Sequence, residues 1–192
     1  WITNKFSRLR VHLMRSYHDC IMTSSQTIIK DNPLLTCRID GLKKRSPARI
    51  ILDNKLRIPI NSNILRDSSK HKTIIFYNKN KEKKIKLLKK LGIKLYKIPL
   101  DKKEGLSLKK TLIKAKDIGF SRIFLESGLK LSTNFFKDDL VNDFKIFISN
   151  KNLKKNGIGN IKKFFSTFLE NKKNTLEKVN LFEDKLLSYK IK

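Results

Sequence analysis

Charged residues that bind small anionic molecules stand close together around a proline. Asp31 and Arg38 lie seven positions apart, and Pro33 between them ends any helix that precedes it. Thr27 shares a face with Asp31 if the intervening residues are helical, and Arg15 ends an expected upstream helix that reaches the same sheet edge. Such residues around a cleft suit a ligand with a phosphate and several hydroxyl or amine groups. A surface salt bridge beside a proline turn is the alternative.

A second candidate site is a turn between a strand and a helix. Glu126 ends an apolar strand, where α/β sheets place their ligands, and Gly128 opens the next helix. The free N–H groups of a helix N-terminus bind phosphates, glycine lets a diphosphate approach, and Lys130, Ser132 and Thr133 add donors. An ordinary turn with a solvent-facing glutamate is the alternative. Together the two sites predict a dinucleotide in one half of a cleft and an anionic substrate in the other.

Alternating helices and strands must position these residues. We expect helices over residues 4–18, 25–30, 79–91, 107–117 and 128–137. We expect strands over residues 20–23, 48–53, 73–77, 93–98, 122–126, 145–148, 175–181 and 185–191, with irregular chain over 55–70 and a loop over 150–163. This order predicts an α/β sheet of mixed direction, with 122–126 as a central strand and the last two strands as an antiparallel pair.

Lysine dominates the charge of the chain. The 192 residues carry a formal net charge of +28, and nine of the 45 basic residues are arginine, which grips phosphates and reads bases in a planar fork. The lysines are spread along the whole chain among Ile, Leu and Asn. This pattern favours a solvated lysine surface, and a lysine-rich domain that binds RNA or another polyanion is the alternative.

Length and apolar content predict one folded domain. Hydrophobic residues make up 39% of the chain, with 12 Phe among them. No apolar run approaches the roughly 18 residues of a membrane span, and Lys5, Arg8 and Arg10 interrupt any secretory signal, so we expect a soluble, cytoplasmic protein. Cys20 and Cys37 form neither a zinc pattern nor a disulfide framework, so we expect no metal.

Four motifs, in order over roughly residues 1–150, resemble the reductase domain of the riboflavin-biosynthesis deaminase/reductase family. They are Trp1-Ile2-Thr3, the pattern Thr27-x-x-x-Asp31-x-Pro33-x-Leu35-Thr36-x-Arg38, the strand and turn at 49–53, and Glu126-x-Gly128. The second pattern is fairly specific, whereas the last is weak alone. Ser127 and Leu129 stand where the family commonly has a small Gly or Ala and a proline.

The resemblance implies a dihydrofolate-reductase-like, three-layer α/β fold with a mixed, mostly parallel central sheet and antiparallel C-terminal strands. It implies NADPH-dependent reduction of the ribosyl group of 5-amino-6-(5-phosphoribosylamino)uracil to the ribityl form in riboflavin biosynthesis. We expect residues 1–192 to be a single reductase domain cut from a multifunctional enzyme, without its first strand and an upstream deaminase domain. The family suggests a homodimer. Another NADPH reductase of the same fold, such as one acting on a pterin, is an alternative.

The resemblance also assigns roles to individual residues. The expected NADPH contacts are Trp1, Thr27, Asp31, Asn54, Gly128, Leu129, Lys130, Leu131, Ser132, Thr133 and Asn134. The expected substrate contacts are Arg15, Leu35, Arg38 and Glu126. Asp31 is the expected catalytic residue, because its position allows it to order the cofactor or relay a proton.

Overall fold

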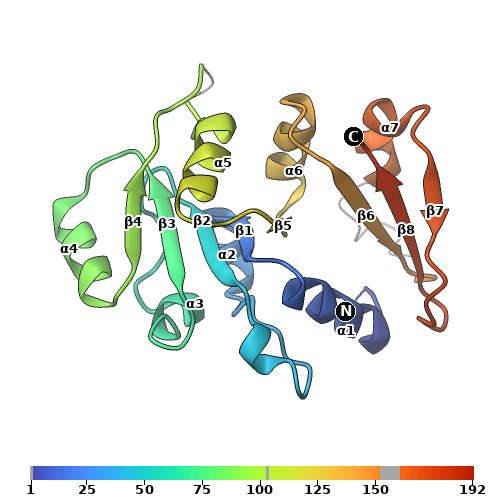
Figure 1. The fold of residues 1–192 in the computed structure, drawn as a ribbon. Coiled ribbons are helices and arrows are strands. Elements are labelled where there is room, and N and C mark those ends of the chain that lie inside the picture. The colour runs from blue at the N-terminus through green and yellow to red at the C-terminus, as the bar shows by residue number, and fades with distance from the viewer. Residues whose placement is uncertain (1, 103, 152–160) are drawn as a thin grey trace. The chain divides into compact units, whose positions relative to one another are not determined.

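The computed structural model describes residues 2–102, 104–151 and 161–192, so Trp1 lies outside the described residues (Figure 1). The chain forms two compact units, one of residues 12–132 and the other of residues 1–11 with 133–192. Helices α1 (Lys5–Ser16) and α6 (Leu129–Lys137) each begin in one unit and end in the other. None of the helices within the described ranges is long and apolar enough to cross a membrane.

A parallel sheet forms the centre of the 12–132 unit. Its order is β4-β3-β2-β1-β5, with every neighbouring pair parallel, as Figure 1 shows. The strands are β1 (Cys20–Ser24), β2 (Ala48–Leu52), β3 (Thr73–Tyr77), β4 (Lys94–Lys97) and β5 (Ile123–Leu125). Within the described residues β5 therefore lies at an edge, and the expectation of a central strand at 122–126 is wrong. Its three residues are only half-buried, as an edge position allows.

The helices of this unit follow the expected positions with two additions, η1 and α3. They are α2 (Ser25–Asp31), the 3-10 turn η1 (Lys43–Arg45), α3 (Asn63–Arg66), α4 (Glu82–Lys90) and α5 (Leu108–Asp117). The short helix α3 lies inside the 55–70 segment that the sequence predicts to be irregular. Its apolar pair, Ile64 and Leu65, is fully buried, so tertiary packing stabilises a single turn that has little helical pattern of its own.

Both faces of the parallel sheet are covered, because successive side chains of a strand point to opposite faces. Ile21, Ile51 and Ile75 share one face and form a buried core with residues of α2, α3 and α4. On the opposite face the ring of Phe76 meets the edge of Tyr96, and Lys114 of α5 lies 4.9 Å from the centre of the Tyr96 ring. Helix, sheet and helix thus form three layers, which explains the nearly continuous apolar runs of β2 and β3.

The other unit holds an antiparallel sheet of order β6-β8-β7. Its strands are β6 (Asp143–Ile148), β7 (Asn174–Leu176) and β8 (Lys185–Lys190), so the predicted C-terminal antiparallel pair is confirmed. Helix α7 (Ile161–Leu169) was not expected from the sequence; it overlaps the end of the predicted 150–163 loop, whose residues 152–160 lie outside the described residues.

Polar contacts tie the first residues of the chain to its last strands within this unit. Asp184 accepts hydrogen bonds from the backbone N–H of Asn4 (2.8 Å) and the hydroxyl of Ser7 (2.6 Å). Glu177 accepts a hydrogen bond from Arg10 at 2.8 Å, and further ones from Lys145 and from the hydroxyl of Ser188. Burial raises the pKa of Glu177, but the bonds from Lys145, Ser188 and Arg10 outweigh it and lower that pKa to about 2.

Candidate functional site

The carboxyl end of β5 holds an arginine–glutamate pair. Arg15, in the last turn of α1, donates from Nε to Oε2 of Glu126 at 2.9 Å and from Nη2 to Oε1 at 2.6 Å. The backbone N–H of Glu126 donates to the carbonyl of Met22 on the neighbouring strand, which fixes the residue beside β1. The Arg15 side chain is 9% exposed and the Glu126 side chain 31%. This bidentate pair is therefore rigid and still open to solvent on the carboxylate side.

The same arginine reaches the proline corner, residues 33–38, which we call the elbow. Nη1 of Arg15 donates to the carbonyl of Thr36 at 2.9 Å. The sequence predicts that the elbow and the Glu126 turn line one cleft, and Arg15 is the residue that brings them together. Four of the five N–H groups of Arg15 are engaged, two by Glu126, one by Thr36 and one by Nδ1 of His12. Arg15 is thus suited to orienting other groups, with one N–H left for a ligand.

Leu35 lies in the interior at the elbow. The whole residue is 2% exposed, and its side chain belongs to the buried core cluster that contains Ile21 and Ile28. Its φ of 54° lies in the left-handed region, which is unfavourable for a leucine. Within the described residues its backbone N–H and C=O have no hydrogen-bond partner. The side chain of Leu35 therefore anchors the elbow in the core.

Asp31 and Arg38 are exposed, and their side chains form no ion pair or hydrogen bond with other described residues. Asp31 ends α2, and Thr27 lies one turn earlier on the same helix, so the shared face predicted from the sequence is confirmed. The Ser24 hydroxyl caps this helix by accepting a hydrogen bond from the Thr27 backbone N–H at 3.2 Å. Both charges are free to meet a ligand.

Arg49, the first buried residue of β2, binds the backbone of the elbow through a hydrogen bond to Leu34. It is fully buried and donates to the Leu34 carbonyl at 3.0 Å, to Asp67 at 2.9 Å and to the Thr73 hydroxyl. Burial lowers the pKa of Arg49, and its pairing with Asp67 opposes that shift. The sequence indicates Arg49 only as part of a strand motif. Its contact with Leu34 joins positions 15 residues apart, which no local pattern predicts.

Two groups of polar atoms fit a dinucleotide cofactor. Asn54, just beyond β2, donates to the Glu104 carbonyl at 3.0 Å, and its own Oδ1 is buried with no partner in the described part of the chain. At the start of α6 the first backbone N–H bonded within the helix is that of Ser132, to the carbonyl of Gly128. The N–H groups of residues 128–131 are therefore available, and a Cβ placed on Gly128 would meet no atom within 4 Å.

The remaining expected cofactor contacts are placed less directly. Thr133 and Asn134 continue α6 in the unit of residues 1–11 with 133–192. Trp1 lies outside the described residues. In the ranges that the structure describes, no group of three or more His, Cys, Asp and Glu side chains is arranged to hold a metal ion.

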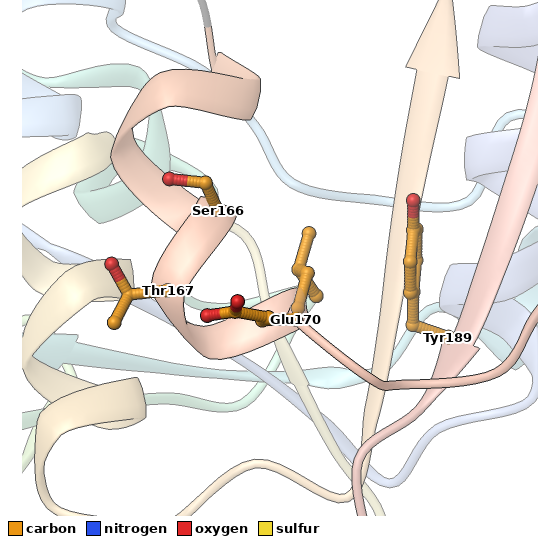
Figure 2. A pocket seen from close by; sticks show the side chains of 5 residues that line it. Ser166, Thr167, Glu170 and Tyr189 are labelled. Carbon is orange, nitrogen blue, oxygen red and sulfur yellow. The ribbon is translucent and has the colours of Figure 1, made fainter.

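A hollow in the other unit contains none of the expected site residues. It encloses about 580 Å³ and is lined by the end of α7 and by Tyr189 of β8. Figure 2 shows Ser166 and Thr167 on the helix, Glu170 just after its end and the Tyr189 ring on the strand across from it. The residues of this hollow therefore form no part of the site expected from the sequence.

Comparison with known proteins gives a consistent set of relatives. A family model described as the RibD C-terminal domain matches residues 1–157. The riboflavin biosynthesis protein RibD of Aquifex aeolicus is 32% identical over 151 residues, which cover 79% of this chain and 40% of that protein. The 5-amino-6-(5-phosphoribosylamino)uracil reductase of Buchnera aphidicola (from Acyrthosiphon pisum) is 36% identical over 81 residues, 36% of this chain and 39% of that protein.

A solved structure shares the fold. The deaminase and 5-amino-6-(5-phosphoribosylamino)uracil reductase of Thermotoga maritima superposes with a TM-score of 0.70 at 22% identity, covering 99% of this chain and 50% of that one. The chain thus spans about 40% to 50% of the length of these relatives. The expected three-layer α/β fold of the reductase domain is confirmed.

Proposed function

Because the chain belongs to the RibD C-terminal domain family, we propose that it reduces the ribosyl group of 5-amino-6-(5-phosphoribosylamino)uracil to the ribityl form, with NADPH as the reductant. The observation that carries this proposal is the linkage of Glu126 to the elbow through Arg15, with Asp31 and Arg38 left exposed. A neutral substrate would not require this concentration of exposed and half-exposed charge.

The substrate side of the proposed site divides its tasks among four residues. Arg38, whose guanidinium is free within the described structure, binds the phosphate as a planar fork. Glu126, held by Arg15 and still half-exposed, accepts hydrogen bonds from hydroxyl or amine groups. Leu35 is buried as a whole residue, so its proposed contact with the substrate falls to its unpaired backbone N–H and C=O. Arg15 holds Glu126 and the elbow in fixed positions relative to each other. Only one of its N–H groups is unengaged, so its direct contact with the substrate is smaller than the sequence predicts.

The cofactor side rests on the free donors of residues 128–131 and on Asn54. The N–H groups at the start of α6 would bind phosphate, and the unpartnered Oδ1 of Asn54 would accept a hydroxyl or amide donor. When bound, NADPH supplies a hydride for the first carbon of the opened ribose. Asp31, exposed at the end of α2 one turn after Thr27, orders the cofactor or relays the accompanying proton. Trp1, Thr133 and Asn134 stay cofactor contacts that the family resemblance alone implies.

The proposed function is tested by NADPH fluorescence and turnover with purified full-length protein. We expect NADPH to bind without substrate, and its absorbance to fall when the phosphorylated pyrimidine is added. Binding of RNA with a steep salt dependence, in a protein that does not bind NADPH, would favour the polyanion-binding alternative instead.

We further infer a longer protein that also carries a deaminase domain, as the name of the Thermotoga maritima relative suggests. We expect a cytoplasmic homodimer, as the family resemblance implies. Mass measurement of the purified protein by light scattering distinguishes a dimer from a monomer, and a deaminase assay on the same preparation tests the second activity.

A further inference from the structure

A buried histidine contacts three groups of the site, although the proposed chemistry gives this histidine no role. His12 lies on α1 one turn before Arg15, and it is 9% exposed. Its Nδ1 is 2.9 Å from the carbonyl oxygen of Thr36, 3.3 Å from the backbone nitrogen of Arg38 and 3.3 Å from Nη1 of Arg15. Nδ1 of His12 therefore lies within hydrogen-bond distance of two elbow residues, Thr36 and Arg38, and of Arg15, which binds Glu126.

Two donors against one acceptor around Nδ1 favour an imidazole with its proton on Nε2. The single lone pair of Nδ1 is then shared by the N–H of Arg38 and one N–H of Arg15, while the carbonyl of Thr36 accepts the other Nη1 proton of Arg15. Nδ1 and the Thr36 oxygen, 2.9 Å apart, are both acceptors in this tautomer, and the Nη1 group of Arg15 lies between them as their common donor. A proton on Nδ1 would be donated to the Thr36 carbonyl and would leave the Arg38 amide without an acceptor. A fully protonated ring would also place a second cation 3.3 Å from the Arg15 guanidinium.

The two arginines around the His12 ring act on its pKa in the same direction as its burial. Burial lowers the pKa of His12 below its usual 6.5, and the cations of Arg15 and Arg38 lower it further. The Thr36 carbonyl and the carboxylate of Glu126 oppose this shift without overcoming it. These groups come from α1, from the elbow and from the turn after β5. At neutral pH the ring is therefore uncharged, as the donor count requires.

We propose that His12 is a positioning residue, which holds Arg15 and the backbone of residues 36–38 in the arrangement that receives the phosphorylated substrate. This inference rests on the proposed function, because the elbow and Glu126 are its proposed substrate contacts. His12 touches no expected ligand itself and acts through Arg15 and through the N–H of Arg38. Protonation would remove the acceptor for that N–H, so substrate binding should weaken in acid while the cofactor side is unaffected.

The kinetic test compares His12→Leu, His12→Gln and the control His71→Gln. We expect His12→Leu to raise the KM for the pyrimidine substrate about 10-fold, with a smaller change in kcat and an unchanged Kd for NADPH. His12→Gln should stay within about 3-fold of the wild type, because its amide offers an oxygen acceptor in place of Nδ1. His71 lies just before β3, at the opposite end of the strands from Glu126, so its variant should behave as wild type.

The pH dependence separates positioning from a purely structural role. In the wild type and in His71→Gln the KM should rise as the pH falls below 6.5, since His12 gains its proton only in that range. In His12→Gln this rise should disappear. An unchanged KM in a folded His12→Leu, or an acid-side rise that persists in His12→Gln, would overturn the proposal.

An amide measurement keeps this test independent of turnover. In the ligand-free protein the ¹⁵N–¹H signal of Arg38 should shift with pH in step with the His12 ring, and the shift should be lost in His12→Gln. A wild type that neither binds nor oxidises NADPH refutes the proposed function, whatever the amide does. An Arg38 signal that ignores His12 refutes the positioning role, even in a protein that reduces its substrate.

Discussion

Each unit of the molecule holds a carboxylate bound by an arginine, and the two carboxylates differ in what remains free. Glu177 accepts three donors, among them Arg10 and Lys145, and its side chain is 17% exposed. Glu126 has Arg15 as its one partner among the described residues and is 31% exposed. A saturated carboxylate stabilises a fold, whereas one with free lone pairs can accept a ligand's donors. We therefore assign Glu177 to stability and Glu126 to binding.

The largest effect on turnover is expected at Asp31, the exposed carboxylate proposed to order the cofactor or relay the proton. Asp31→Asn should lower kcat by about 100-fold, the lower end of the range for general acid–base groups, and leave the melting temperature unchanged because the residue is exposed. Stopped assays of NADPH oxidation, with calorimetry on the same samples, measure both. Wild-type turnover in this variant would remove Asp31 from the mechanism.

Glu126→Gln tests the binding side of the comparison directly. The amide keeps one acceptor oxygen but loses the charge that pairs with Arg15, so we expect kcat/KM to fall by roughly 30-fold, in line with the loss of a charged hydrogen bond. Steady-state kinetics against both substrates give the value. A variant that loses stability without losing kcat/KM would make Glu126 a structural residue like Glu177.

Arg38→Ala should act mainly on substrate affinity. Its guanidinium has no partner among the described residues, so removing it costs the fold little. We expect the KM for the phosphorylated pyrimidine to rise about 10-fold while kcat changes less. A dephosphorylated substrate should show no such difference between wild type and variant, which identifies the phosphate as the group bound. An equal loss with both substrates would contradict the assignment.

Glu177→Gln should have the smallest effect on turnover and a clear effect on stability. Its folded pKa of about 2 lies below the usual 4.5, so its contribution is present above pH 4.5 and is lost as the pH falls toward 2. We expect the variant to lose roughly 1–3 kcal/mol at neutral pH and to show a flatter acid-side decline than wild type. Urea unfolding at several pH values measures this, and a parallel decline in both proteins would refute the assignment.

Much of the fold can be predicted from periodicity, because its strands are short apolar runs between turn residues. Ile50 to Leu52 and Ile74 to Phe76 are buried on both faces, as continuous apolar runs predict for parallel strands. The same reasoning misplaced β5, since an apolar triplet does not show how many neighbours its strand has. Helix α7 was missed because its apolar pattern follows a lysine- and asparagine-rich stretch that is typical of a loop.

The candidate site was predictable in its residue types but not in its contacts. The spacing of Thr27 and Asp31 fixes a shared helical face, so that relation needs no tertiary structure. The pairing of Arg15 with Glu126 joins positions 111 residues apart, and nothing local distinguishes it from a phosphate-binding arginine. His12 stands three residues before Arg15, a spacing that places both on one side of α1. That spacing was the available signal, but it does not show which elbow atoms the ring would meet.

The left-handed leucine of the elbow has a consequence for how this protein can change. Its conformation costs about 1–3 kcal/mol, which the burial of its side chain among Ile21 and Ile28 must offset. The unpaired backbone N–H and C=O of Leu35 are therefore positioned by the hydrophobic interior. A methyl group removed from that interior, as in Ile28→Val, would loosen the aim of Leu35 without touching any ligand. Selection for affinity consequently acts on residues that solvent and substrate never reach.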